Sequence, residues 1–239
     1  MLKPRLRVAV FDVDGTLVRP GDILSARALQ SALISGYGLE RVNLAALRRE
    51  ALTSREAVVA LAVRHGLSED EAMAGADGVI RLRDIFYGAA VAAGPAREGL
   101  AASPYARDFI SALRKARVQL SLATGNSEFV ARTKLYRAGL DPTIFAVGAF
   151  GDTPGRRDEL VAAALDKMRI YSEFDISEVI VIGDCPADIR AGQSVGTRTL
   201  AVASGSFSSA ELEAAGPDLL VDDLKPTARL MRHVLGAER

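Results

Sequence analysis

Six short apolar segments rich in β-branched residues recur along this chain, and amphipathic segments lie between them. Each apolar segment is followed by polar or glycine-containing turn residues, which is typical of buried strands. This alternation predicts an α/β fold with a doubly wound parallel sheet, whose ligands bind beyond the carboxyl ends of the strands. The predicted strands are Leu6–Phe11, Val118–Ala123, Ile144–Val147, Val179–Ile182, Thr199–Ala203 and Leu219–Val221. Predicted helices between them include Tyr105–Ala116, Glu128–Ala138 and Asp158–Met168.

One interval, from about Arg19 to Arg97, breaks the alternation because it carries helical patterns without a convincing strand. Helices are predicted over Asp22–Ser35, Asn43–His65, with a break near Thr53, and Ser68–Ala92. The simplest account is a helical insert directly after the first strand, with Gly94-Pro95 and Ser103-Pro104 marking the return to the sheet. We therefore expect a core domain of residues 1–18 and 98–239 and a helical domain of residues 19–97.

Composition narrows the possible partners and the compartment. The 239 residues include 30 basic and 30 acidic side chains, so no overall positive field favours nucleic acid or a membrane surface. Cys185 is the only cysteine, which excludes an internal disulfide and suits a reducing compartment. No apolar stretch is long enough to span a bilayer. We expect a cytoplasmic protein, monomeric or homodimeric, that acts on a small molecule.

Two carboxylates, Asp12 and Asp14, follow the first predicted strand and precede Gly15-Thr16. At a strand exit both can face the crevice, where hard oxygen ligands suit Mg²⁺ and the cation would offset their repulsion. One carboxylate could then attack phosphorus, and the other could act as general acid and base. A calcium-binding loop is excluded, because its required Gly and Glu positions hold Leu17 and Ile23. This motif alone does not exclude the alternative that Asp14-Gly15 forms an ordinary surface turn.

Polar side chains also follow two later strands. Thr124 comes directly after one strand, and Asn126 or Ser127 opens a helix, so a hydroxyl and free backbone N–H groups there suit an anion. An ordinary helix N-cap explains the same residues. Asp184 ends another strand and Asp188 follows four residues later, where both could ligate a metal, although Asp188 alone also fits the positive end of a helix dipole. Three strand ends that each carry such polar residues would occur together by chance far less often than any one of them alone.

In order, strand context and spacing, these motifs resemble those of the haloacid dehalogenase-like superfamily of phosphatases and phosphomutases. FDVDGTL at residues 11–17 is similar to its first motif, LATGN at 122–126 to its second, and GDCPADIRAG at 183–192 to its fourth. The resemblance covers essentially the whole chain. It implies a Rossmann-like core, an α-helical cap between the first and second motifs as in phosphoglycolate phosphatases, and Mg²⁺ as cofactor.

The resemblance implies a role for each matching residue. Asp12 would be the nucleophile that becomes phosphorylated, and Asp14 would be the general acid and base. Thr124 would hold the transferring phosphoryl group. The substrate would also meet the backbone N–H of Gly125, and Asn126. The implied metal ligands are Asp12, Asp14 through its backbone carbonyl, Asp184 and Asp188.

The third family motif departs from the pattern. The family normally places a Lys there to neutralise the nucleophile and the phosphate, whereas residues 151–160 read GDTPGRRDEL. Arg157, or failing that Arg156, resembles the substitute, because a guanidinium can bridge a carboxylate and a phosphate. Lys134 and Lys167 are poorer candidates, since both lie inside predicted helices and a solvated helix face explains each more simply.

The helical insert is similar to a cap that closes over an active site and excludes water. Thr53 or Arg55 could point into the crevice and hold an anionic substrate, but Thr53 and Glu56 also have capping-box spacing, so a helix start explains them equally. The sequence thus predicts a Mg²⁺-dependent phosphatase that hydrolyses small phosphorylated metabolites, of the phosphoglycolate or sugar-phosphate type, through a covalent aspartyl-phosphate. A phosphomutase and a non-catalytic phosphate-binding module are the alternatives.

Overall fold

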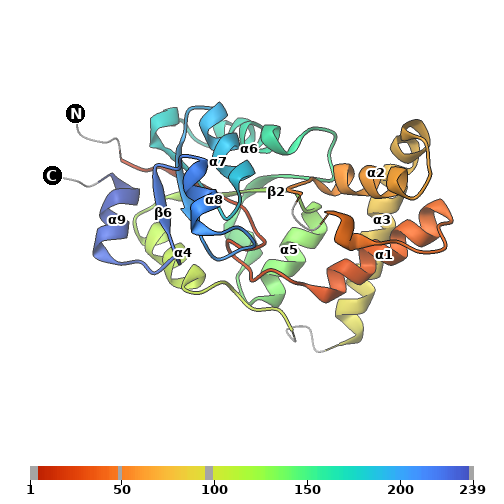
Figure 1. Ribbon diagram of the computed structural model, residues 1–239. Helices are drawn as coiled ribbons and strands as arrows, with labels where there is room; N and C mark the ends of the chain where they lie inside the picture. The colour runs from red at the N-terminus through yellow and green to blue at the C-terminus, as the bar shows by residue number, and fades with distance from the viewer. Residues whose placement is uncertain (1–4, 48–49, 95–98, 237–239) are drawn as a thin grey trace.

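A six-stranded sheet forms the centre of the molecule (Figure 1). The computed structural model describes residues 5–47, 50–94 and 99–236. Neighbouring strands are parallel, in the order β3-β2-β1-β4-β5-β6. The strands are β1 (Val8–Phe11), β2 (Gln119–Thr124), β3 (Val147–Phe150), β4 (Val179–Gly183), β5 (Arg198–Val202) and β6 (Leu219–Val221). The strand order reverses at β1, so the ligand crevice of this topology lies at the carboxyl end of β1.

Helices cover both faces of the sheet, because side chains alternate in direction along each strand. Ala9 and Phe11 join one buried cluster with residues of α4, α5 and α9, whereas Val8 and Val10 join another with residues of α6 and α7. In Figure 1, α6 and α7 lie toward the top of the sheet domain and α4 and α5 toward the bottom. The helices are α4 (Ala106–Lys115), α5 (Glu128–Arg137), α6 (Leu160–Arg169), α7 (Pro186–Ser194), α8 (Ser209–Ala214) and α9 (Ala228–Leu235).

The helices between β1 and α4 form a separate lobe beside the sheet (Figure 1). The lobe has its own buried cluster, which includes Leu33, Leu61 and Val79. Thr53 and Ser68 each cap a helix through a capping box. The lobe's helices are α1 (Ile23–Tyr37), a 3₁₀ turn at Leu44–Leu47, α2 (Ser54–Arg64) and α3 (Glu69–Ala93).

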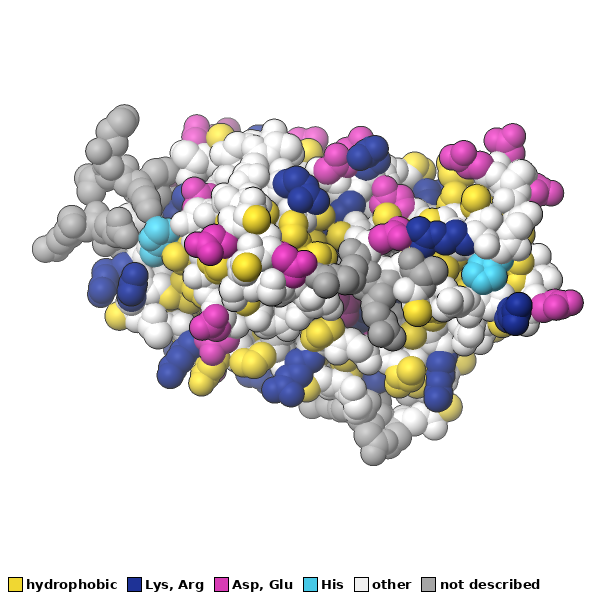
Figure 2. Space-filling view, in the orientation of Figure 1, with side chains coloured by type: hydrophobic (Ala, Val, Ile, Leu, Met, Phe, Trp, Pro, Cys, Tyr) yellow, Lys and Arg dark blue, Asp and Glu magenta, His cyan; other side chains and the backbone are white. Residues whose placement is uncertain are grey.

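The surface carries charges of both signs. Basic and acidic side chains are interspersed over the face seen in Figure 2, in keeping with 30 of each in the sequence. Within the described ranges, every helix is too short or too polar to cross a membrane.

The predicted α/β fold with a doubly wound parallel sheet is confirmed. One strand was misplaced, since the segment predicted at Ile144–Val147 becomes strand only from Val147 onwards. The preceding Pro142–Ile144 forms a 3₁₀ turn, because the Asp141 side chain accepts a hydrogen bond from the Thr143 N–H at 2.9 Å. This local hydrogen bond favours the turn more than the β-branched residues of the segment favour a strand.

The helical insert also follows the predicted pattern in its described part. The break predicted near Thr53 is confirmed, since α2 begins only after that residue. The described residues before it form a 3₁₀ turn at Leu44–Leu47, where part of a helix over Asn43–His65 was predicted. The predicted domain boundary between residues 97 and 98 lies outside the described residues. The division into residues 19–97 and the remainder therefore stays a prediction.

A buried ion pair joins the helical lobe to the sheet layer. The Asp22 carboxylate caps α1 by accepting from the Leu24 N–H at 3.2 Å. It also accepts from Arg137 Nη1 of α5 at 2.8 and 2.9 Å and from the Tyr87 hydroxyl of α3 at 2.6 Å. Asp22, Arg137 and Tyr87 are all buried, so one carboxylate fixes α1, α3 and α5 to each other.

Replacing Asp22 by Ala should lower the free energy of unfolding by about 3–5 kcal/mol, because it strands a buried guanidinium. Urea denaturation followed by circular dichroism measures this. The matched control is Asp166→Ala, which removes an exposed ion pair with Arg169 and should change stability by less than about 0.5 kcal/mol. A loss of less than about 1 kcal/mol for Asp22→Ala would contradict the account.

Candidate active site

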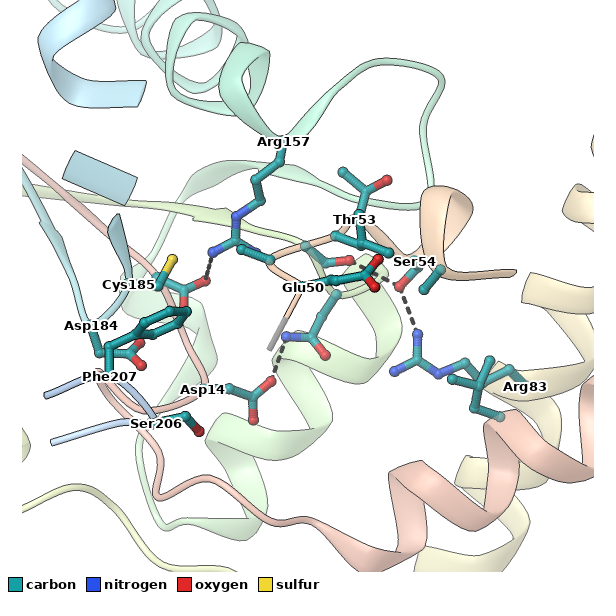
Figure 3. Close-up of a pocket in the computed structure, with 17 residues that line it drawn as sticks. Asp14, Glu50, Thr53, Ser54, Arg83, Arg157, Asp184, Cys185, Ser206 and Phe207 are labelled. Atoms are coloured by element: carbon teal, nitrogen blue, oxygen red, sulfur yellow. Dashed lines mark hydrogen bonds and ion pairs between the residues drawn. The ribbon is translucent and has the colours of Figure 1, made fainter. Parts of the chain in front are cut away.

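Several of the predicted site residues, among them Asp12, Thr124 and Asp184, meet at the carboxyl ends of β1, β2 and β4. The Asp12 N–H donates to the Ile182 carbonyl at 3.0 Å, so the pairing of β1 with β4 continues one residue beyond the strand. Asp12 therefore stands beside the end of β4, where Asp184 follows. A cavity of about 240 Å³ opens here (Figure 3). Its wall includes Asp12, Asp14, Gly125, Asn126, Arg157 and Asp184.

Three buried carboxylates form a compact acidic cluster. Asp12, Asp184 and Asp188 each offer an oxygen within 4.8 Å of the others. Asp184 accepts from the Thr16 hydroxyl at 3.1 Å. A Cβ at Gly15, where φ is +81°, would meet the Asp184 carboxylate at 2.3 Å, so this tight approach requires glycine.

Burial shapes the charge of this cluster. It raises the pKa of Asp12 to about 7, against the opposing charge of Arg157 and with a further rise from Asp188. Burial, with the nearby Asp12 and Asp188 charges, also holds the pKa of Asp184 well above its usual value. Asp12 Oδ1 is buried without a hydrogen bond. Clustered oxygens, one of them unsatisfied, fit a hard divalent cation such as Mg²⁺.

Arg157 is the arginine that reaches Asp12, the predicted nucleophile. Its Nη2 donates to Asp188 Oδ1 at 2.6 Å and lies 3.2 Å from Asp12 Oδ1. Arg156 lies outside the site, because its side chain is 75% exposed and pairs with Asp158. Of the two arginines considered for the third motif, Arg157 lies in the wall of this cavity and Arg156 does not.

The segment after β2 closes another side of the cavity. Thr124 is fully buried, and its Oγ1 accepts from Asn126 Nδ2 at 3.0 Å. A Cβ at Gly125 would lie 2.4 Å from the Leu52 carbonyl oxygen and 2.5 Å from Arg157 Nη1. Gly125 therefore allows the helical lobe and Arg157 to approach the same point.

Asp14 faces away from the acidic cluster, toward α5. Its Oδ2 accepts from Asn126 Nδ2 at 2.8 Å and from Lys134 Nζ at 2.6 Å. Burial alone would raise the pKa of Asp14, but the charge and hydrogen bond of Lys134, with the Asn126 hydrogen bond, outweigh it and lower that pKa. Ionised Asp14 is the form that a general base needs.

The interpretation of Lys134 as part of a solvated helix face was wrong. Its side chain is only 6% exposed, because α5 buries Val130, Ala131 and Leu135 on the same stripe. The i, i+4 spacing of Val130 and Lys134 was the feature of the sequence that could have indicated this burial. Lys167 differs: it lies on α6 and donates to the Gly148 carbonyl at 2.8 Å.

The start of α2 docks directly onto the core loops. The Ser54 backbone N–H and hydroxyl both donate to the Gly125 carbonyl, at 2.6 and 3.0 Å, and the Arg55 N–H donates to the Gly151 carbonyl at 3.0 Å. The lobe therefore covers the cavity.

The two predicted cap contacts differ in outcome. Thr53 lines the cavity and forms the capping box, accepting from the Glu56 N–H at 3.1 Å while Glu56 accepts from the Thr53 N–H at 2.8 Å. The Arg55 guanidinium instead pairs with Asp77 inside the lobe and is absent from the cavity wall among the described residues.

Sequence reasoning missed Arg83 of α3, a buried cation in the cavity wall (Figure 3). Its guanidinium donates to Ser54 Oγ at 2.6 Å and to Ser25 Oγ at 3.1 Å, while its Nε is buried without a hydrogen bond. Burial lowers the pKa of Arg83, against the effect of nearby acids. Its i+3 and i+4 spacing from the buried Ile80 and Val79 was the available signal.

A family profile described as haloacid dehalogenase-like hydrolase matches residues 6–196. Comparison with curated protein sequences gave no match.

Solved structures share the fold. CbbY from Rhodobacter sphaeroides, in complex with xylulose-(1,5)bisphosphate, is 22% identical, with a TM-score of 0.71 over 93% of this chain and 96% of that one. A predicted phosphoglycolate phosphatase from Haemophilus somnus 129pt is 19% identical, with a TM-score of 0.66 over 95% and 98%. A putative β-phosphoglucomutase from Thermotoga maritima is 21% identical, with a TM-score of 0.61 over 96% and 100%.

The raised pKa of Asp12 predicts how stability depends on pH without metal. Between its unfolded value of 3.8 and about 7, folded Asp12 holds a proton that the unfolded chain releases, so its contribution to stability declines as pH rises through this window. The melting temperature of wild type should therefore fall more steeply between about pH 5 and pH 8 than that of Asp12→Asn.

Calorimetry in chelator measures both slopes, and equal slopes would contradict the prediction. Added Mg²⁺ should raise the wild-type melting temperature more at the higher pH, because carboxylate ligands bind metal without their protons.

Proposed function

This chain belongs to the haloacid dehalogenase-like hydrolase family, and we propose that it is a Mg²⁺-dependent phosphatase of small phosphorylated metabolites. The observation that carries the proposal is the separation of Asp12 from Asp14. Asp12 lies in the acidic cluster beside Arg157, whereas Asp14 lies beside Asn126 and Lys134. Two neighbouring carboxylates thus have environments suited to different tasks.

Asp12, Asp184 and Asp188 are the side chains that would hold Mg²⁺, with the family's backbone carbonyl at Asp14. The bound cation would offset the negative charge of these carboxylates and of the substrate phosphate.

The chain's own residues would carry out two transfers. An Asp12 oxygen attacks phosphorus, and the bond from phosphorus to the ester oxygen breaks as Asp14 gives that oxygen a proton. Arg157, Thr124 and the Gly125 N–H orient the phosphoryl group. Asp14 then takes a proton from water, which attacks the aspartyl-phosphate and releases phosphate. The negative charge of a bound phosphate would oppose the effect of Lys134 on Asp14, which would allow Asp14 to carry the proton.

The helical lobe would act as the cap. Ser54 and the Arg55 N–H bind the loops after β2 and β3, so the helical lobe would cover the cavity and exclude water from it. Opening would require these hydrogen bonds to break, which admits substrate and releases product.

The cavity supports a small substrate with a second polar or anionic group. About 240 Å³ suits a small metabolite, and the buried Nε of Arg83 has no partner to satisfy it. Phosphoglycolate and sugar phosphates supply such groups, and similar folds carry the names phosphoglycolate phosphatase and β-phosphoglucomutase.

A phosphomutase of the same family remains the second candidate. It would pass the phosphoryl group of Asp12 to another hydroxyl of the substrate instead of to water. Oxygen-18 from labelled water appears in released phosphate only if water is the acceptor. A non-catalytic phosphate-binding module is disfavoured, because pure binding gains nothing from the Asp14 position.

Asp12→Asn should reduce Mg²⁺-dependent hydrolysis of 4-nitrophenyl phosphate by at least about 10³-fold, because an amide cannot serve as the nucleophile. Steady-state kinetics with and without chelator measure the loss. Asp166→Asn, an exposed change on α6, is the control and should keep wild-type rates. Undiminished turnover by Asp12→Asn would exclude the covalent mechanism.

Arg83→Met should raise KM about tenfold or more for a phosphate ester with a second anionic group, because a charge-assisted hydrogen bond is lost. KM for 4-nitrophenyl phosphate, which lacks that group, should change little. The exposed Arg81→Met on the same helix is the matched control. An equal rise of KM for both substrates in Arg83→Met would show that Arg83 does not bind the second anionic group.

A further inference from the structure

Lys134 is a buried cation to which the mechanism above gives no task. Its side chain is 6% exposed, and desolvating an ammonium group is costly without a charged partner. The partner is Asp14, whose Oδ2 lies 2.6 Å from Lys134 Nζ. A lysine on the inner face of a packed helix therefore reaches one particular carboxylate in the site.

Asn126 completes a closed set of hydrogen bonds around Asp14. Its Nδ2 donates to Asp14 Oδ2 at 2.8 Å and to Thr124 Oγ1 at 3.0 Å, while its Oδ1 accepts from Lys134 Nζ at 3.1 Å. The amide is thereby oriented with its oxygen toward Lys134 and its nitrogen toward Asp14. Asp14, Asn126 and Lys134 are thus each hydrogen-bonded to the other two.

Both donors bind the same oxygen of Asp14. Lys134 Nζ and Asn126 Nδ2 converge on Oδ2, and no hydrogen bond among the described residues engages Oδ1. Asp14 lines the cavity, and Figure 3 shows its carboxylate among the other side chains of the wall. Oδ1 is therefore the oxygen left for a substrate.

Lys134 contacts Asp14 without belonging to the wall of the described cavity. It is absent from the cavity wall among the described residues, whereas Asp14, Asn126 and Arg157 belong to it. Arg157 and Lys134 thus pair with different carboxylates: Arg157 lies beside Asp12 and Asp188, and Lys134 lies beside Asp14.

We infer that Lys134 is a positioning residue, which together with Asn126 anchors Oδ2 of Asp14 so that Oδ1 faces the leaving-group oxygen. This inference rests on the proposed role of Asp14 as general acid and base. An alcohol leaves well only when it receives a proton, whereas nitrophenolate leaves as a stable anion. Misplacing Asp14 should therefore harm alkyl esters selectively.

The test compares kcat/KM for benzyl phosphate and 4-nitrophenyl phosphate, because kcat/KM covers the steps up to departure of the leaving group. Lys134→Met should lower the ratio of benzyl to nitrophenyl kcat/KM by about tenfold or more. Both rates come from one sample, so the ratio does not depend on the fraction of enzyme that folds. If Lys134→Met is insoluble, Lys134→Gln is measured with the same expectation.

Two further variants separate positioning from packing. Lys134→Arg keeps a cationic donor and should return the ratio to within about threefold of wild type. Lys167→Met removes a lysine that bonds only a backbone carbonyl among the described residues, and should leave the ratio unchanged.

The outcomes distinguish this inference from the function on which it rests. Equal losses on both esters in Lys134→Met, with active wild type, would overturn the positioning role alone. Wild-type protein that hydrolyses neither ester would overturn the proposed function and this inference with it.

Discussion

Repulsion between carboxylates at the end of β1 is the constraint on which the rest of the site depends. Asp12 and Asp14 are two residues apart, and Asp184 is brought beside Asp12 by the pairing of β1 with β4. Such groups can be buried together only if cations compensate their charges or if some of them hold a proton. Arg157 and Lys134 come from different elements and approach different carboxylates, which keeps the two acids in separate environments.

The same arrangement links the cap to the chemistry. Ser54 binds the Gly125 carbonyl in the loop that would orient phosphate, and Arg83 in turn donates to the Ser54 hydroxyl. A substrate group that bound Arg83 would thereby contact the hydrogen-bonded set that holds the cap on the core. Substrate recognition and closure would then depend on the same few side chains.

The fold and the grouping of the acidic residues could be predicted from the sequence, because the carboxyl ends of the strands in a parallel sheet meet at one edge. Asp12 and Asp184 could be placed together on that basis. Lys134 and Arg83 could not, since a charged residue in a helix enters a site only when tertiary packing buries its face. Arg55 could point into the crevice on the basis of the sequence, but in the structure its guanidinium pairs with Asp77 on another helix of the lobe. That partner also depends on tertiary packing, which the local sequence does not show.

The most direct test of the account is to look for the phosphoryl group on Asp12. Enzyme, Mg²⁺ and 4-nitrophenyl phosphate are mixed, quenched rapidly in acid and digested, and the peptides are analysed by mass spectrometry. The account predicts a phosphorylated peptide that contains Asp12 and appears before free phosphate. Release of phosphate without any phosphorylated Asp12 peptide, under conditions that preserve acyl phosphates, would contradict it.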